Sequence, residues 1–268
     1  MTTTADVVRF SMRNAIVLAI ASLVSAAGFI WPFFYSGESL PRTQIFFTLA
    51  VFTALVLTIM EISNSRLDAK SVALLGVLSA LIAALRPLGA GAVGIEPMWF
   101  LLILAARVFG PSFGFLLGVI SVFVSALLTG GFGPWLGYQI FAAAWIGLIA
   151  GLLPGRSSIR GKREIALLMV YAVFAALLFG ILMDLQFWPW ALGANTQLSY
   201  APEAGLRENI SYFLTFHFLS AMAWDIPRAI FTAGLILIAG RPVLTALRRT
   251  YMRAAFLTPI EFIERERA

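Results

Sequence analysis

The sequence predicts an all-α protein, a polytopic membrane helix bundle with about eight spans. Its residues are 60% hydrophobic and 12% charged, and its mean hydropathy is +0.92. A soluble domain carries roughly 25% charged residues, so folding in water could not bury this much apolar surface. The apolar residues also fall into runs close to the roughly 20 residues that a membrane-spanning helix needs. We therefore expect lipid to surround most of the chain.

Eight apolar runs are candidate spans. They cover residues 14–32, 44–62, 71–88, 97–108, 112–129, 135–153, 165–186 and 211–240. Turn-forming residues separate several of them, as at Gly110-Pro111 and Pro154-Gly155. The first run follows Arg9 and Arg13, as in a signal peptide. Because it is long enough to span the bilayer and no A-x-A cleavage site follows it, we expect a retained helix.

The basic residues predict the orientation of the bundle. With the N-terminus inside, 15 of the 19 Lys and Arg residues face the cytoplasm. Arg42, Arg86 and Arg207 then face outward, and Arg228 lies within the last span. An excess of Lys and Arg in cytoplasmic segments is the usual bias of membrane proteins. Both termini are therefore predicted to be cytoplasmic, with residues 254–268 as a polar tail.

Several chemistries lack the residues that they need. The chain has no cysteine, which excludes disulfides and thiolate metal sites. His217 is the single histidine, so one chain cannot form a polyhistidine site. We expect no metal and no cofactor, and we assign the net charge of +6 to the membrane surface rather than to nucleic acid. No G-x-x-x-x-G-K-[ST] motif is present, so ATP hydrolysis through a P-loop is not expected of this chain.

Small residues four apart form stripes on three of the predicted helices. Their members are Gly76, Ala80 and Ala84; Gly110, Gly114 and Gly118; and Ala143, Gly147 and Gly151. Such stripes let helix backbones approach closely in lipid. Packing between the protein's own helices is the simpler interpretation, and a groove that receives another subunit is the alternative.

Three segments resemble a known family. They are the helix with Gly76, Ala80 and Ala84, the Gly-Gly-Phe-Gly-Pro-Trp-Leu-Gly-Tyr-Gln run at 130–139, and the Trp224–Ala229 segment with Asp225 and Arg228. Together they resemble the substrate-binding subunits, or S-components, of energy-coupling factor (ECF) vitamin transporters. The resemblance implies a six-helix core at 71–253. Residues 1–70 would then add two N-terminal membrane helices to that core.

The resemblance also implies a function and a set of partners. Such a subunit is not an enzyme. It captures a vitamin or cofactor precursor outside the cell, in the plasma membrane of a bacterium. A membrane coupling subunit and two cytoplasmic ATPases then drive its release inside. The stripe of Gly76, Ala80 and Ala84 would dock on the coupling subunit.

A ligand cavity is expected at the outer end of the bundle, where aromatic and polar residues gather around the loops at 88–97 and 187–210. Aromatic walls with a few fixed polar groups are typical of small-molecule sites. The predicted walls are Trp99, Trp135, Trp188 and Trp190, and the predicted polar anchors are Glu96, Gln139, Asp184 and His217. Arg86 flanks the first of these loops. Asp225 and Arg228, three residues apart on one helix, are predicted to form a structural ion pair.

Two other functions remain open from the residues alone. An intramembrane lipid-modifying enzyme would need a clustered catalytic set, and the carboxylates here are scattered over different spans. A self-contained secondary transporter would usually show an internal repeat, which this sequence does not show convincingly. The substrate stays open among ring compounds such as thiamine precursors, riboflavin, queuosine or the larger cobalamin.

Overall fold

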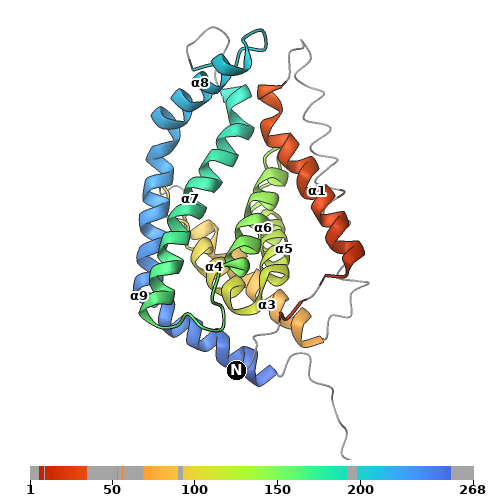
Figure 1. Ribbon diagram of the computed structural model, residues 1–268, viewed down its shortest axis with the longest axis vertical. Coiled ribbons are helices and arrows are strands. Elements are labelled where there is room, and N and C mark those ends of the chain that lie inside the picture. The colour runs from red at the N-terminus through yellow and green to blue at the C-terminus, as the bar shows by residue number, and fades with distance from the viewer. Residues whose placement is uncertain are drawn as a thin grey trace, which may run out of the picture.

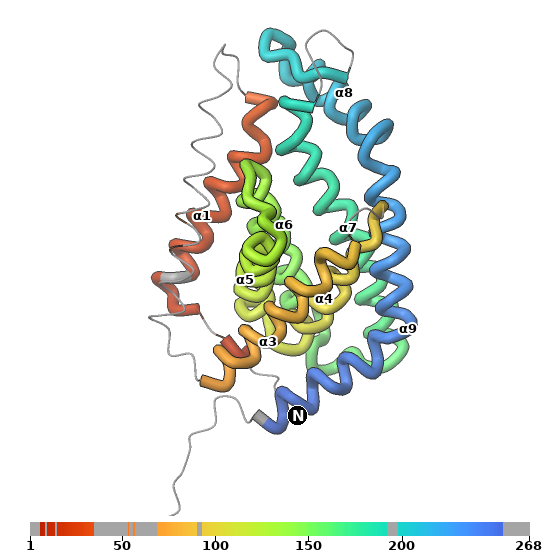
Figure 2. The backbone as a smooth tube through the Cα atoms, turned by 180° about the vertical axis from the view of Figure 1, so that it is seen from behind, coloured from red at the N-terminus to blue at the C-terminus, as the bar shows by residue number. Residues whose placement is uncertain are grey.

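The computed structural model describes residues 6–8, 10–34, 53, 56, 69–89, 93–191 and 198–254 of the chain. These residues form helices and turns and include no strand, which confirms the all-α prediction. The helices are α1 (Met12–Ile30), α3 (Ala69–Leu85), α4 (Met98–Phe109), α5 (Pro111–Thr129), α6 (Leu136–Leu152), α7 (Lys162–Ala191), α8 (Leu206–Phe216) and α9 (Met222–Ala254). In Figures 1 and 2, α4, α5 and α6 lie between α1 on one side and α7 and α9 on the other.

The helices are those of a polytopic membrane bundle. Five stretches are long and apolar enough to cross a membrane: Ala15–Phe33, Ala69–Gly89, Pro111–Thr129, Lys162–Ala191 and Leu206–Arg253. α4 and α6 are shorter apolar helices. The predicted second span, 44–62, lies outside the described residues apart from Thr53 and Val56. The predicted number of eight spans therefore stays a prediction.

α5 and α6 pack backbone against backbone at the centre of the bundle. A methyl group built on Gly147 would lie 2.1 Å from the carbonyl oxygen of Gly114, and one built on Gly118 would lie 2.5 Å from that of Ala143. Only residues without larger side chains permit this approach. The stripes on these two helices thus serve internal packing, as the simpler interpretation predicted.

The ends of α5 follow the local sequence. Pro111 occupies the first turn, where its missing N–H leaves no hydrogen bond unmade. The helix ends at Gly130, whose φ of 65° is left-handed and favours glycine. Because such signals are local, the predicted bounds of 112–129 agree closely with the observed helix.

Two helices extend beyond their predicted bounds. α7 was expected over 165–186 but continues to Ala191 through Pro189, because the Trp188 side chain is fully buried among aromatic rings and holds the last turns in place. The last helical segment was expected over 211–240. It begins at Leu206 with α8 and passes through a short π-helix at His217–Ala221, here called the π-turn. It then continues as α9 through Pro242 to Ala254, where the tail was predicted to begin.

The additional N-terminal helix α1 packs on α6 and α7. The indole N–H of Trp145 donates to Ser22 Oγ at 3.2 Å. The ring of Phe29 meets that of Tyr138 edge to face, with centroids 4.8 Å apart. Residues such as Ile20 and Leu23 on its other face are exposed and apolar, as expected where a helix meets lipid.

Charged residues gather at one end of the bundle. Arg107, whose side chain is fully buried, donates to Glu164 and to the carbonyls of Leu153, Pro154 and Gly155. Arg248 near the end of α9 also binds Glu164, at 2.6 Å. Arg156 pairs with Asp6 and so ties the N-terminal segment to the same end. These arginines belong to the group predicted to be cytoplasmic. Which side of a membrane this end faces stays a prediction.

Candidate functional site

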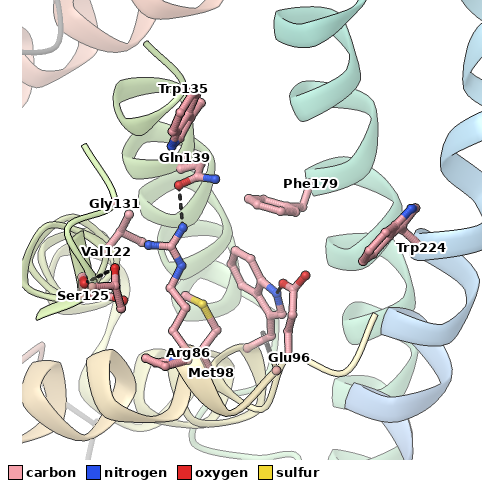
Figure 3. A pocket seen from close by; sticks show the side chains of 14 residues that line it. Arg86, Glu96, Met98, Val122, Ser125, Gly131, Trp135, Gln139, Phe179 and Trp224 are labelled. Carbon is pink, nitrogen blue, oxygen red and sulfur yellow. Dashed lines mark hydrogen bonds between the residues drawn. The ribbon is translucent and has the colours of Figure 1, made fainter. Parts of the chain in front are cut away.

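A pocket of about 400 Å³ opens at the other end of α4, α5 and α6 from the Arg107–Glu164 cluster. α4 has only 12 residues, so it spans about 18 Å and the pocket is recessed below the top of the longer α7. Figure 3 shows the pocket from close by. It is lined by Arg86, Pro87, Gly89, Glu96, Met98, Trp99, Val122, Ser125, Thr129, Gly131, Trp135, Gln139, Phe179 and Trp224.

A hydrogen bond joins α3 to α6 across the pocket. Arg86, one residue beyond the end of α3, extends its guanidinium so that Nη2 donates to Gln139 Oε1 at 2.5 Å. Gln139 lies in the first turn of α6, four residues after Trp135 of the Gly-Pro-Trp turn. Arg86 is therefore held by an uncharged partner while its side chain forms part of the wall.

Glu96 orients one aromatic wall of the pocket and connects it to α9. Its Oε2 accepts from the indole N–H of Trp99 at 2.5 Å, and its Oε1 accepts from Arg228 Nη2 at 3.1 Å. Arg228 also donates through Nη1 to Asp225 Oδ1 at 2.5 Å, and its guanidinium lies 5.0 Å from the centroid of the Phe179 ring. The predicted pair of Asp225 and Arg228 is thus part of a bridge of three residues, which Glu96 completes and which joins α9 to the loop just before α4.

The loop before α4 is pressed against the backbone of α9. Gly94 has a φ of 69°, and a methyl group there would lie 2.6 Å from both the amide nitrogen of Arg228 and the carbonyl oxygen of Trp224. Glycine is the residue that permits both the left-handed backbone and this contact. The bridge through Glu96 and the close approach at Gly94 together fix the loop beside the pocket.

A second polar group lies between α7 and the π-turn. His217 Nδ1 and Asp184 Oδ2 are 2.6 Å apart, and both side chains are largely buried. Asp184, His217 and Asp225 each place one potential ligand atom within 4.8 Å of the others. A methyl group on Gly180 would lie 1.8 Å from Asp225 Oδ2, so this carboxylate rests directly on the backbone of α7. The expectation that the chain binds no metal stays a prediction.

A model of the family described as "ECF transporter, substrate-specific component" matches residues 70–240, which is more than half of the chain. The chain belongs to this family. No curated protein and no solved structure matches it.

The match assigns this substrate-specific component to a class of membrane transporter subunits. It is therefore not an enzyme, which sets aside the intramembrane enzyme considered from the sequence. The matched range runs from the start of α3 into α9, so it includes every residue of the pocket. α1 lies outside the matched range.

Four of the eight predicted ligand residues of this S-component line the pocket: Glu96, Trp99, Trp135 and Gln139. The other four lie elsewhere. Trp188 is fully buried, with its indole N–H donating to the carbonyl of Leu198 at 2.7 Å, and Trp190 packs near Trp31 with ring centroids 6.3 Å apart. Asp184 and His217 bond to each other. The structure does not place these four on the pocket wall.

The loop predicted at 187–210 differs from the observed structure. Its first residues belong to α7 and its last belong to α8. Residues 192–197 of this range lie outside the described residues. Tyr200 is buried and packs against Trp188 with ring centroids 5.4 Å apart. The described part of this region thus forms an aromatic cluster of its own.

The sequence alone did not select the remaining wall residues. Arg86 was recognised only as flanking the loop, and Trp224 only as part of a segment that carries the family resemblance. Ser125 and Phe179 were not distinguished from other residues of apolar helices. A charge or an aromatic beside a predicted loop is a usable signal, as Glu96 and Trp135 illustrate. No comparable signal marks Phe179 in the middle of α7, because its helix is apolar on all sides.

Proposed function

We propose that this S-component captures a vitamin or related cofactor precursor from outside the cell in the pocket beside Arg86 and Trp99. The observation that carries the proposal is the make-up of that pocket. Trp99, Trp135, Phe179 and Trp224 supply aromatic surface, while a few polar groups held by hydrogen bonds supply orientation. Concave apolar sites with a small number of fixed polar groups are the usual form of small-molecule sites.

The exposed stripe on α3 supports docking on a membrane coupling subunit, which works with two cytoplasmic ATPases. Gly76, Ala80 and Ala84 are exposed, and no atom of the described residues lies within 4 Å of a methyl group built on Gly76. Their neighbours Ser79 and Ala83 are buried against the bundle. Within the described part of the chain nothing covers the stripe, and small residues accept a partner helix at close range. Because α3 leads directly to Arg86, one helix connects the docking surface to the pocket wall.

Ligand capture is tested by thermal unfolding of the full-length protein in detergent with a panel of vitamins and their precursors. A ligand that binds only the folded state stabilises it by about 2.7 kcal/mol at a concentration 100 times its Kd. At least one compound is expected to raise the Tm in this way. If none in the panel does so, the proposed capture function is wrong.

Substitution of one tryptophan in the pocket and one in the aromatic cluster around Trp188 distinguishes ligand binding from structural packing. Trp135→Ala is expected to weaken binding of the stabilising compound about 10-fold, because a ring contact contributes up to about 1.5 kcal/mol. The free protein should keep its stability, since Trp135 is 45% exposed. Trp188→Ala should instead lower the stability of the free protein by about 3–5 kcal/mol, the usual cost of removing a buried aromatic ring. Both effects are read from the same unfolding curves, and unchanged binding in Trp135→Ala would exclude this pocket.

Docking is tested by adding bulk to the exposed stripe. Ala80→Trp is expected to abolish co-purification with the coupling subunit and ligand uptake by cells, while ligand binding by the purified protein stays unchanged. The matched control is Val170→Trp, at an exposed apolar position of α7 where the side chain can extend into lipid. Equal uptake by the two variants would contradict docking through α3.

A further inference from the structure

In the described residues no carboxylate forms an ion pair with Arg86, in contrast to the other enclosed arginines; Glu96 acts on it electrostatically but does not contact it. Arg107, Arg156, Arg228 and Arg248 each form an ion pair with Asp or Glu at 3.1 Å or less. Among the arginines that are not exposed in the described residues, Arg86 alone donates only to an uncharged group, the amide of Gln139.

Glu96 is the other charged side chain on the wall, and its charge is already engaged. Its two carboxylate oxygens accept from Trp99 and from Arg228. In Figure 3 the guanidinium of Arg86 is directed toward Gln139 and not toward Glu96. The pocket therefore has one side where a carboxylate is bound and an opposite side where a cation has only a neutral partner.

A hydroxyl without a partner lies on the Arg86 side of the pocket. Ser125 lines the pocket and is 0% exposed, and its Oγ has no hydrogen-bond partner among the described residues. Buried hydroxyls almost always have a partner. A ligand atom in the pocket would supply one. Gln139 contributes further, because its Oε1 accepts from Arg86 and its amide nitrogen is left to donate.

We propose that the ligand of this pocket is an organic anion, a flat ring compound whose carboxylate or phosphate group binds Arg86 with Gln139 and Ser125 beside it. The aromatic walls take the ring, and Arg86 takes the charge. Charge-assisted hydrogen bonds of a guanidinium to such groups are shorter and stronger than neutral ones. This inference rests on the proposed function, since it names the class of substrate for the same pocket.

The test uses matched pairs of ring compounds that differ in charge. The full-length protein in detergent is titrated with nicotinate and nicotinamide, with pyridoxal phosphate and pyridoxal, and with each compound that stabilised it in the vitamin panel and its uncharged analogue. The acidic member of each binding pair is expected to bind about 10- to 100-fold more tightly, the range of a hydrogen bond to a charged group. Binding is followed by quenching of tryptophan fluorescence, because three tryptophans line the pocket.

Arg86→Met assigns that preference to one side chain. In this variant the acidic compound is expected to bind no better than its uncharged analogue, whose own affinity stays unchanged. Gln139→Leu, which leaves the charge in place, should lose only part of the preference. Without ligand, Arg86→Met should unfold at the wild-type temperature or above, because no carboxylate loses its partner. Arg207→Met, an exposed position of α8, is the control and should behave as the wild type in every titration.

The outcomes separate this inference from the proposed function. If the vitamin that binds carries no acidic group, or if the preference for the acid survives in Arg86→Met, the proposal of an organic anion is wrong, while the proposal of ligand capture still holds. Phosphatidylglycerol, added in a further titration, distinguishes a lipid head group from a small-molecule acid. Saturable binding of this lipid in the pocket, with no ring acid able to displace it, would also overturn the proposal.

Discussion

Arg228→Met is expected to destabilise the protein by about 3–5 kcal/mol, the usual cost of removing one partner from a buried ion pair. Arg228 is bound to Asp225, whose side chain is 2% exposed, and to Glu96. The substitution leaves a buried carboxylate without its cation. It also releases Glu96, which holds the indole of Trp99, so ligand binding should fall together with stability. Thermal unfolding and ligand titration in detergent measure both effects.

Two further variants test whether the ion pair itself is responsible. Arg249→Met removes an arginine from an exposed position of the same helix and should leave the Tm unchanged. Asp225→Leu combined with Arg228→Met should recover part of the lost stability, because apolar residues of similar volume often replace a buried pair without loss. If Arg228→Met unfolded at the temperature of Arg249→Met, the bridge between α9 and α4 would have no structural role.

The helix bounds that the sequence predicted well are those with local signals. Gly110-Pro111 and Gly130 mark the two ends of α5, and both positions have backbone angles that demand these residues or favour them. The extension of α7 has no such signal. The predicted span ended at residue 186, whereas the burial of Trp188 against Phe213 and Tyr200 depends on segments far apart in the chain.

The candidate site was predicted in part for the same reason. Residues next to the predicted loops, such as Glu96 and Gln139, could be placed at the same end of the bundle from the span boundaries alone. Which face of a helix turns inward is decided by packing, and a helix apolar on all sides does not reveal it. His217 and Asp184 were assigned to the ligand, but the structure pairs them with each other. Their pairing depends on the π-turn, for which the sequence contains no marker.

Gly147→Ala is expected to destabilise the protein by about 3 kcal/mol, at the upper end of what added methyl groups cost in a packed interior. The added methyl group would lie 2.1 Å from the carbonyl oxygen of Gly114 and 2.6 Å from its carbonyl carbon. Both are backbone atoms, which cannot rotate away as a side chain would. α5 and α6 would therefore have to separate along their whole contact, which includes the close approach of Gly118 to Ala143. The Tm in detergent and the fraction of monodisperse protein measure this loss.

Gly234→Ala makes the same chemical change where there is room for it. Gly234 lies inside α9, and none of the residues that the structure describes has an atom within 4 Å of a methyl group built there. Because alanine favours a helix over glycine by up to about 1 kcal/mol, this variant should be as stable as the wild type or slightly more so. The difference between the two variants isolates the helix contact from the effect of glycine on the unfolded chain. Equal melting temperatures for Gly147→Ala and Gly234→Ala would show that α5 and α6 do not meet through Gly114 and Gly147.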